Sequence, residues 1–530
     1  MFIAELEKFF NKWRIILACF LFAYFIILLL NLVNQPFNWD EVTHLNRALE
    51  LKSGLLNDFV RDSFYPPLFP FFTTVSFDLF GASLFSARLV SAIFSVLTLW
   101  VVYEFANSMY GEKTALLSTV FLAVMPGYFW LSRLALIEIT LVFFFTLSLF
   151  FFYRWLTVKK NYFAILSGLA LGLGFLAKYQ IVAAGALMIV CILFLGRGRL
   201  KWFFSRFTLL IVASLAMVIP WLVIAYKVLS SYVFEQWIYA LQMGNPGRSL
   251  YSGRFPIPVF YIVEMVWPYP DVHPVSLLLY AAGIAGLAIL LLRHNREDKL
   301  VFIWFVTVYV FFTIISNREW RYVLTLFPAL AISASALFFF AYEKIKKKFI
   351  RRLNPVTIRR NKILIGLLIG FLFVSIAYSV NDIYYNVKQN SINIEIKQAT
   401  DYVVANDDSN QSILVLCPYN FFSQDMVKFY LWASGKPQIQ TYQYPALPVD
   451  TYTPVFNIND LINICEQDNV KYIFTYENGG TTPYFNTTLS LVDIYIQIYD
   501  SKAFSEISPS MTFGENPRRV LVLTYLGNEN

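Results

Sequence analysis

The chain has 530 residues, of which 58% are hydrophobic and only 14% are charged. With a mean hydropathy of +0.56, it is too apolar for a soluble globular protein, and the composition indicates a polytopic membrane protein. The formal charge of +8 falls in short basic clusters between apolar runs. Because basic residues in such places orient membrane spans, we expect no nucleic-acid partner.

Apolar runs long enough to cross a hydrocarbon core of roughly 30 Å, about 20 residues each, recur through the first 380 positions. The runs at 162–177 and 180–195 are short, so one of these two segments is expected to be re-entrant or tilted. In all we predict about eleven transmembrane helices, near residues 15–34, 82–106, 114–130, 136–156, 162–177, 180–195, 207–228, 273–292, 300–316, 322–342 and 363–380.

The basic clusters also predict which side of the membrane each loop faces. With the N-terminus inside, the loops near 154–160, 197–206, 293–299 and 344–362 are cytoplasmic, in agreement with the positive-inside rule. An odd number of spans puts the segment after residue 380 on the extracytoplasmic face, together with the long loops near 35–81 and 229–272. We therefore expect the chemistry of the protein on that face.

The last 150 residues differ in character from the rest of the chain. Short apolar runs at 412–417, 471–476 and 519–525 are typical of buried strands, and the patterns at 425–433 and 458–467 are typical of helices. The sequence thus predicts a transmembrane domain over 1–380 and a small extracytoplasmic α/β domain over 381–530.

The segment 39–48 predicts an amphipathic helix just after the first span, because its residues separate onto two faces. The polar face holds Asp40, His44 and Arg47, and the apolar face holds Val42, Leu45 and Leu49.

Two interpretations of the carboxylates in this helix are open. In the first, Asn38 and Glu41 form a capping box and Asp40 complements the helix dipole. In the second, Asp40 is a general base held at the membrane surface. His44 alone is more typical of a hydrogen-bonding residue than of a metal ligand.

Polar side chains at the ends of membrane spans are costly in lipid, so each is a candidate for function. Glu138 begins an apolar run and needs a partner, which is either an ion pair with Arg133 or Lys178 that locks helices together or a catalytic or metal role. Two arginines near 320 suit phosphate oxygens, which guanidinium groups bind bidentately. The candidates on the outer side are Tyr65, Arg133, Glu138, Lys178, Arg318, Arg321 and Tyr322.

Two further patterns have simple structural interpretations. Gly168, Gly172 and Gly174 indicate close helix packing, and Lys178 can extend its amine to the interface from the end of its helix. Together the polar groups suit group transfer from a lipid-anchored phosphate, whose departing charge cations stabilise and which needs only one base. A polytopic transporter or lipid flippase that uses the same charges is the alternative, although it predicts an internal repeat that we do not find.

These residues resemble the GT-C glycosyltransferases, in the branch that includes protein O-mannosyltransferases and lipid A aminoarabinose transferases. The resemblance covers roughly residues 10–345. It rests on the order of Trp39-Asp40-Glu41 with His44 and Arg47, Tyr65-Pro66-Pro67-Leu68, Arg88, Arg133 to Glu138, Gly172 to Lys178, and Arg321-Tyr322 with Pro328.

The resemblance implies inverting transfer of a hexose or pentose from a polyprenyl-phosphate donor to an acceptor protein, glycan or lipid. Asp40 matches the first-loop catalytic acid, with Glu41 beside it, and Glu138 matches the second acidic position. Lys178 and Arg321 match positions near the donor phosphate. The rest of the expected substrate-binding set is His44, Arg47, Tyr65, Arg133, Arg318 and Tyr322.

No cofactor is otherwise implied; a divalent metal ion, if the reaction uses one, is expected on Asp40 and Glu138. The metal-binding histidines of aminoarabinose transferases have no counterpart here, and no loop is long enough for the β-trefoil inserts of protein O-mannosyltransferases.

Overall fold

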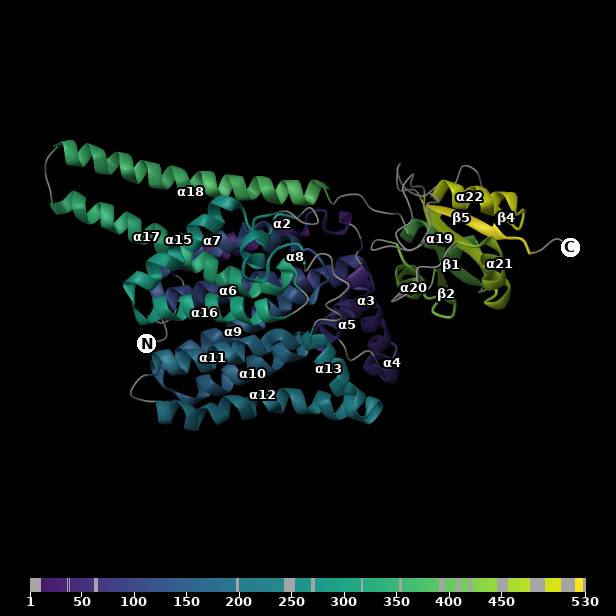
Figure 1. Ribbon diagram of the computed structural model, residues 1–530, viewed down its shortest axis with the longest axis horizontal. Helices are drawn as coiled ribbons and strands as arrows, with labels where there is room; N and C mark the ends of the chain where they lie inside the picture. Colours follow the sequence, from purple (N-terminus) through teal and green to yellow (C-terminus); the bar gives the residue numbers. More distant parts are fainter. Residues whose placement is uncertain are drawn as a thin grey trace. The chain divides into compact units, whose positions relative to one another are not determined.

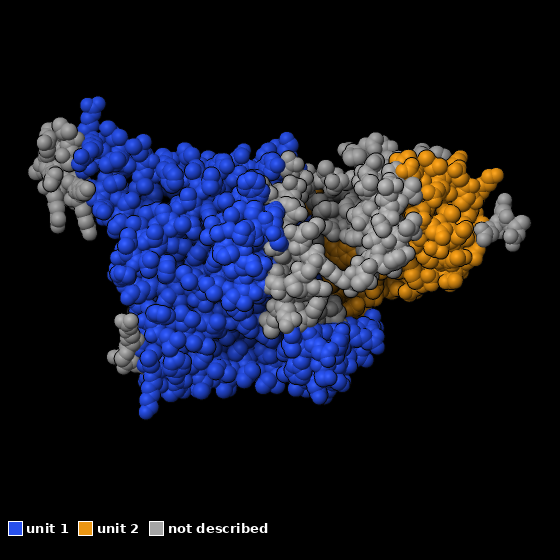
Figure 2. Space-filling view, in the orientation of Figure 1, with its two compact units in different colours: residues 1–30, 55–72, 88–389 blue, residues 31–54, 73–87, 390–530 orange. Residues whose placement is uncertain are grey.

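The computed structural model is mostly helical, with a small sheet near the C-terminus (Figure 1). Its chain divides into two compact units (Figure 2): unit 1 is Met1–Leu30, Leu55–Phe72 and Arg88–Gln389, and unit 2 is Asn31–Gly54, Thr73–Ala87 and Asn390–Asn530. The described residues are 11–35, 37, 39–61, 65–196, 200–242, 253–267, 272–315, 318–351, 355–389, 396–406, 411–417, 422–445, 456–476, 491–506 and 520–527.

Helices account for nearly all described residues up to 389. In chain order they are α2 (Lys12–Leu29), η1 (Leu32–Asn34), α3 (Trp39–Lys52), α4 (Leu56–Arg61), α5 (Leu68–Phe80), α6 (Leu84–Tyr110), α7 (Glu112–Ala123), α8 (Pro126–Leu131), α9 (Ile137–Val158), α10 (Asn161–Ala177), η2 (Tyr179–Ile181), α11 (Val182–Leu195), α12 (Leu200–Leu229), α13 (Tyr232–Gln242), η3 (Ile257–Val259), α14 (Phe260–Glu264), α15 (Leu277–Arg293), α16 (Arg296–Ile314), η4 (Trp320–Leu326), α17 (Phe327–Arg351) and α18 (Pro355–Gln389).

Each predicted apolar run coincides largely with one helix or with two consecutive helices. The run at 114–130 is divided into α7 and α8, because Pro126 begins a new helix. Over the described residues, six helical stretches are long and apolar enough to cross a membrane, and four apolar helices are shorter. The multi-pass membrane fold is therefore confirmed, while the number of spans stays a prediction.

Small residues allow two of these helices to pack closely. Gly168 and Gly172 on α10 face the backbone carbonyls of Leu210 and Ser214 on α12, and a Cβ atom at either glycine would collide with them. Figure 1 shows α9, α10 and α12 running alongside one another in unit 1. The packing predicted from the glycine spacing is thus confirmed.

Unit 2 contains the predicted α/β domain, built on a five-stranded sheet of order β2-β1-β3-β5-β4. β1 is parallel to β2 and β3, whereas β5 is antiparallel to β3 and β4. The elements are α19 (Ile396–Asn406), β1 (Ser412–Leu416), α20 (Gln424–Ala433), β2 (Thr441–Tyr444), α21 (Ile458–Gln467), β3 (Val470–Tyr476), α22 (Leu491–Asp500), β4 (Phe504–Glu506) and β5 (Val520–Tyr525).

Unit 2 also includes α3, which comes from the long loop near residues 35–81. The Asn46 side chain on α3 donates a hydrogen bond to the Asp425 carbonyl on α20 at 3.0 Å, and the Phe37 and Phe429 rings meet edge to face at 5.7 Å. The sequence places the domain boundary at residue 380, whereas α18 continues to Gln389 and α3 packs with the C-terminal domain. No local pattern in the sequence predicts this association.

Candidate functional site

Three chain segments of unit 1 bring four of the predicted site residues together. Glu138 lies in the first turn of α9, where the helix dipole favours a carboxylate. Lys178 directly follows the last residue of α10, in extended backbone. Arg321 and Tyr322 lie in η4, ahead of α17. We call these four residues the charge cluster.

Both cations of the charge cluster lie near one carboxylate oxygen of Glu138. Lys178 Nζ lies 3.0 Å from Glu138 Oε1, and Arg321 Nη1 lies 3.9 Å from the same oxygen. The Tyr322 ring is 5.0 Å from Lys178 Nζ, a cation–π distance. Glu138 is 3% exposed and Lys178 is 9% exposed, so water screens these charges poorly.

The ion-pair interpretation of Glu138 is confirmed for Lys178 and is wrong for Arg133. The Arg133 guanidinium donates to the carbonyls of Leu28 and Leu30 at 2.8 Å each, which are unsatisfied at the end of α2. Burial and the nearby charge of Arg88 lower the pKa of Arg133 to about 10, so it remains charged at neutral pH. Arg133 therefore closes a helix end and does not pair with Glu138.

The remaining predicted residues of unit 1 lie in short connecting segments. Arg318 is buried, and its Nε donates to the Thr313 carbonyl at 3.3 Å. Glu319, the residue just before η4, forms an ion pair with Arg321. Tyr65 is half-buried just before α5 begins at Leu68.

In unit 2, α3 carries the other predicted site residues. Asp40 is half-buried in the first turn of α3. Glu41, His44 and Arg47 are 0%, 1% and 2% exposed, as deeply buried as the apolar face. Asn38, the predicted cap, lies outside the described residues. Because burying polar groups is costly, a helix buried on its polar face is more typical of a site than of a surface.

One buried ion pair in the long loop near residues 229–272 was not predicted. Arg254 Nη2 lies 2.5 Å from Glu264 Oε2, and Glu264 is 0% exposed. The sequence pattern that could have identified Glu264 is the one that identified Glu138, which is a carboxylate next to apolar residues. The loop was recognised as long, but no residue in it was singled out.

The surroundings of Glu138 do not fit a divalent metal ion. Its Oε1 already contacts the two cations of the charge cluster, which would repel a third positive charge at that oxygen. Within the described ranges, no group of three or more His, Cys, Asp or Glu side chains is arranged to hold a metal.

Sequence comparisons match part of this chain to a known family model and to a relative from another organism. A family model described as dolichyl-phosphate-mannose-protein mannosyltransferase matches residues 65–224. A relative from Aquifex aeolicus (strain VF5), described only as an uncharacterized protein, is 25% identical over 333 residues. That match covers 61% of this chain and 63% of the relative, which is less than two thirds of the relative's length.

Two solved structures share the fold at low sequence identity. ArnT from Cupriavidus metallidurans, bound to undecaprenyl phosphate, matches with a TM-score of 0.64 and 14% identity, over 97% of this chain and 98% of that chain. AglB from Archaeoglobus fulgidus, an archaeal oligosaccharyltransferase in complex with an inhibitory peptide and a dolichol-phosphate, matches with a TM-score of 0.53 and 13% identity. That match covers 86% of this chain and 69% of AglB. The chain therefore shares its fold with ArnT and AglB, and residues 65–224 match the mannosyltransferase family model.

Proposed function

We propose that the protein is an inverting glycosyltransferase that moves a hexose or pentose from a polyprenyl-phosphate donor to a protein, glycan or lipid acceptor on the extracytoplasmic face. The observation that carries the proposal is the convergence of Lys178 and Arg321 on one buried point. Two solved structures of this fold hold a polyprenyl phosphate, undecaprenyl phosphate in ArnT and dolichol-phosphate in AglB, which supports the donor class.

The reaction needs one base and a cationic site for the leaving group. An acceptor oxygen or nitrogen attacks the anomeric carbon on the face opposite the phosphate, and the bond from that carbon to the phosphate oxygen breaks. The electron pair stays on the phosphate, where Lys178 and Arg321 stabilise the charge. The acceptor's proton passes to the Asp40 carboxylate. No step is assigned to a metal ion.

Glu138 acts in this proposal as a positioning residue. Its carboxylate fixes Lys178 and draws Arg321 toward the same place, so that both cations are ordered before the donor binds. Glu41, His44 and Arg47 shape the helix that presents Asp40, while Tyr65, Arg133, Arg318 and Tyr322 stay predictions for substrate contact.

The proposed orientation follows from the basic residues at the other end of α9. Arg154 lies sixteen residues after Glu138 on this helix, which corresponds to about 24 Å along the axis at about 1.5 Å per residue. Lys159 and Lys160 follow at that end. Because basic residues favour the cytoplasmic side, the charge cluster is proposed to face outward.

The test is to change Asp40 to Asn in the purified full-length protein. The protein is incubated with a panel of polyprenyl-phosphate sugars, and release of the polyprenyl phosphate is measured with and without chelator. Loss of the base should slow transfer by about 10² to 10⁴-fold. Asp58→Asn, an exposed carboxylate of the same loop paired with Arg61, is the control. Full transfer by Asp40→Asn would remove Asp40 from this role.

A further inference from the structure

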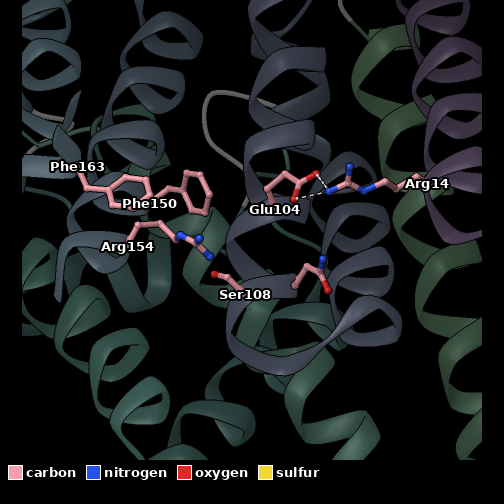
Figure 3. A pocket seen from close by; sticks show the side chains of 7 residues that line it. Arg14, Glu104, Ser108, Phe150, Arg154 and Phe163 are labelled. Carbon is pink, nitrogen blue, oxygen red and sulfur yellow. Dashed lines mark hydrogen bonds and ion pairs between the residues drawn. The ribbon is translucent and has the colours of Figure 1, made fainter. Parts of the chain in front are cut away.

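A cavity of about 420 Å³ lies among helices of unit 1 (Figure 3). No residue of the charge cluster lines it. Four helices, α2, α6, α9 and α10, contribute its walls. Its lining residues are Arg14, Glu104, Asn107, Ser108, Phe150, Arg154 and Phe163.

The cavity lies at the end of α9 opposite to Glu138. Arg154 belongs to the last turns of this helix, and Phe163 to the first turn of α10. This is the end where the basic loops cluster and where we predict the cytoplasmic headgroup region. Sugar transfer as proposed above does not involve this end of the bundle.

The charges that line the cavity leave one cation in excess. Arg14 Nη2 and Glu104 Oε1 form an ion pair at 3.0 Å. The Arg154 guanidinium lies 5.4 Å from the centre of the Phe163 ring, and in Figure 3 it points toward Ser108. Within the described parts of the chain, no carboxylate forms an ion pair with Arg154. A half-buried guanidinium of this kind favours binding of an anion.

The walls indicate that this anion is amphipathic. Phe150 and Phe163 form an aromatic side, while Asn107 and Ser108 supply polar groups beside the arginines. We propose that the cavity binds the phosphodiester headgroup of an anionic phospholipid, with Arg154 donating to a phosphate oxygen and the acyl chains lying along the aromatic side. Basic pockets between membrane helices on the cytoplasmic side suit such headgroups.

The experiment compares phospholipids in nanodiscs that contain the full-length protein. Retention of phosphatidylglycerol over phosphatidylcholine is measured by mass spectrometry, for the wild type and for Arg154→Gln. Arg206→Gln is the matched control, because Arg206 is also half-buried and lies 4.6 Å from an aromatic ring, that of Trp202. We expect Arg154→Gln to weaken the preference about fivefold and Arg206→Gln to leave it unchanged.

A second variant tests the site without removing its arginine. Ser108→Asp places a carboxylate in the same cavity, on the residue toward which Arg154 points (Figure 3), where an ion pair with Arg154 maintains packing and displaces the lipid phosphate. Its preference for phosphatidylglycerol should fall as far as that of Arg154→Gln. The proposal is overturned if either variant retains the wild-type preference, or if millimolar inorganic phosphate alone competes the lipid away from the wild type, which would indicate a site for the free ion.

Discussion

Replacing Glu138 with Gln should destabilise the protein, because it leaves the buried Lys178 ammonium and the half-buried Arg321 guanidinium facing a neutral group. Gln has nearly the same shape as Glu, so the change removes charge without opening a cavity. Its amide oxygen can still accept a hydrogen bond from Lys178, but it carries no charge to oppose Lys178 and Arg321. The variant therefore isolates the electrostatic part of the charge cluster.

The magnitude follows from the two distances to Glu138 Oε1. At an effective dielectric constant of about 20, the attraction is about 5.5 kcal/mol for Lys178 at 3.0 Å and about 4.3 kcal/mol for Arg321 at 3.9 Å. Desolvation of the buried ions offsets part of this attraction. Removing one partner of a buried ion pair typically costs about 3 to 5 kcal/mol, and we expect a loss in unfolding free energy of that size.

The assay is reversible denaturation in mixed micelles, with the double variant Glu138→Gln/Lys178→Gln as the second measurement. Because the double variant removes the uncompensated ammonium, it should recover a large part of the lost stability without restoring sugar transfer. Asp58→Asn, which breaks an exposed pair with Arg61, should change stability by less than about 1 kcal/mol. A Glu138→Gln protein as stable as the wild type would refute the assignment of Glu138 as the anchor of both cations.

Two further predictions concern packing and titration. Gly172→Ala should lower the unfolding free energy by about 1 to 3 kcal/mol, because its methyl group would collide with the Ser214 carbonyl. Gly185 has open space around it, so Gly185→Ala should be neutral or slightly stabilising. Denaturation of both variants tests this difference in the sign of the stability change. Burial raises the pKa of the Asp425 carboxyl above its ordinary 3.8, which the nearby charge of Lys428 partly opposes. At pH values below 3.8 the protonated carboxyl therefore stabilises the folded state, and this stabilisation is lost as the pH rises through the folded-state pKa. Asp425→Asn should slow hydrogen exchange in β1 and β3 near pH 7 and have no effect near pH 3.

The elements that the sequence predicts well are those with a continuous local signal. The apolar membrane helices and the buried strands β1, β3 and β5 each have such a run. β2, whose strand Thr441–Tyr444 is mostly half-buried, has none and was not predicted. The hydrogen bond between Asn46 and Asp425 joins segments that are far apart in the chain, so no local sequence pattern predicts it.

The candidate site shows the same division between local and distant information. Glu138 was predicted as a site residue because a carboxylate next to an apolar run is costly. For the same reason it needs a cationic partner, for which the sequence offered Arg133 or Lys178. The choice between these two partners depends on where α2 ends, because Arg133 donates its hydrogen bonds to the carbonyls of Leu28 and Leu30 there. Backbone carbonyls occur at every residue, so the sequence carries no sign of which ones an arginine will bind.

The pairing of Glu138 with Lys178 and Arg321 affects how a loss of activity in Glu138 variants is to be interpreted. Lys178 and Arg321 share one oxygen of Glu138, and Arg321 also pairs with Glu319. Removing the Glu138 carboxylate therefore leaves the Lys178 ammonium uncompensated and alters both stability and the cationic site. Loss of transfer in Glu138 variants is therefore expected from misplaced cations alone, and by itself it would not assign a chemical role to that carboxylate. Asp40 is half-buried on a separate unit, and its Asn variant should keep the wild-type unfolding free energy. Only a variant that loses transfer while its stability is unchanged identifies the group that takes the acceptor's proton.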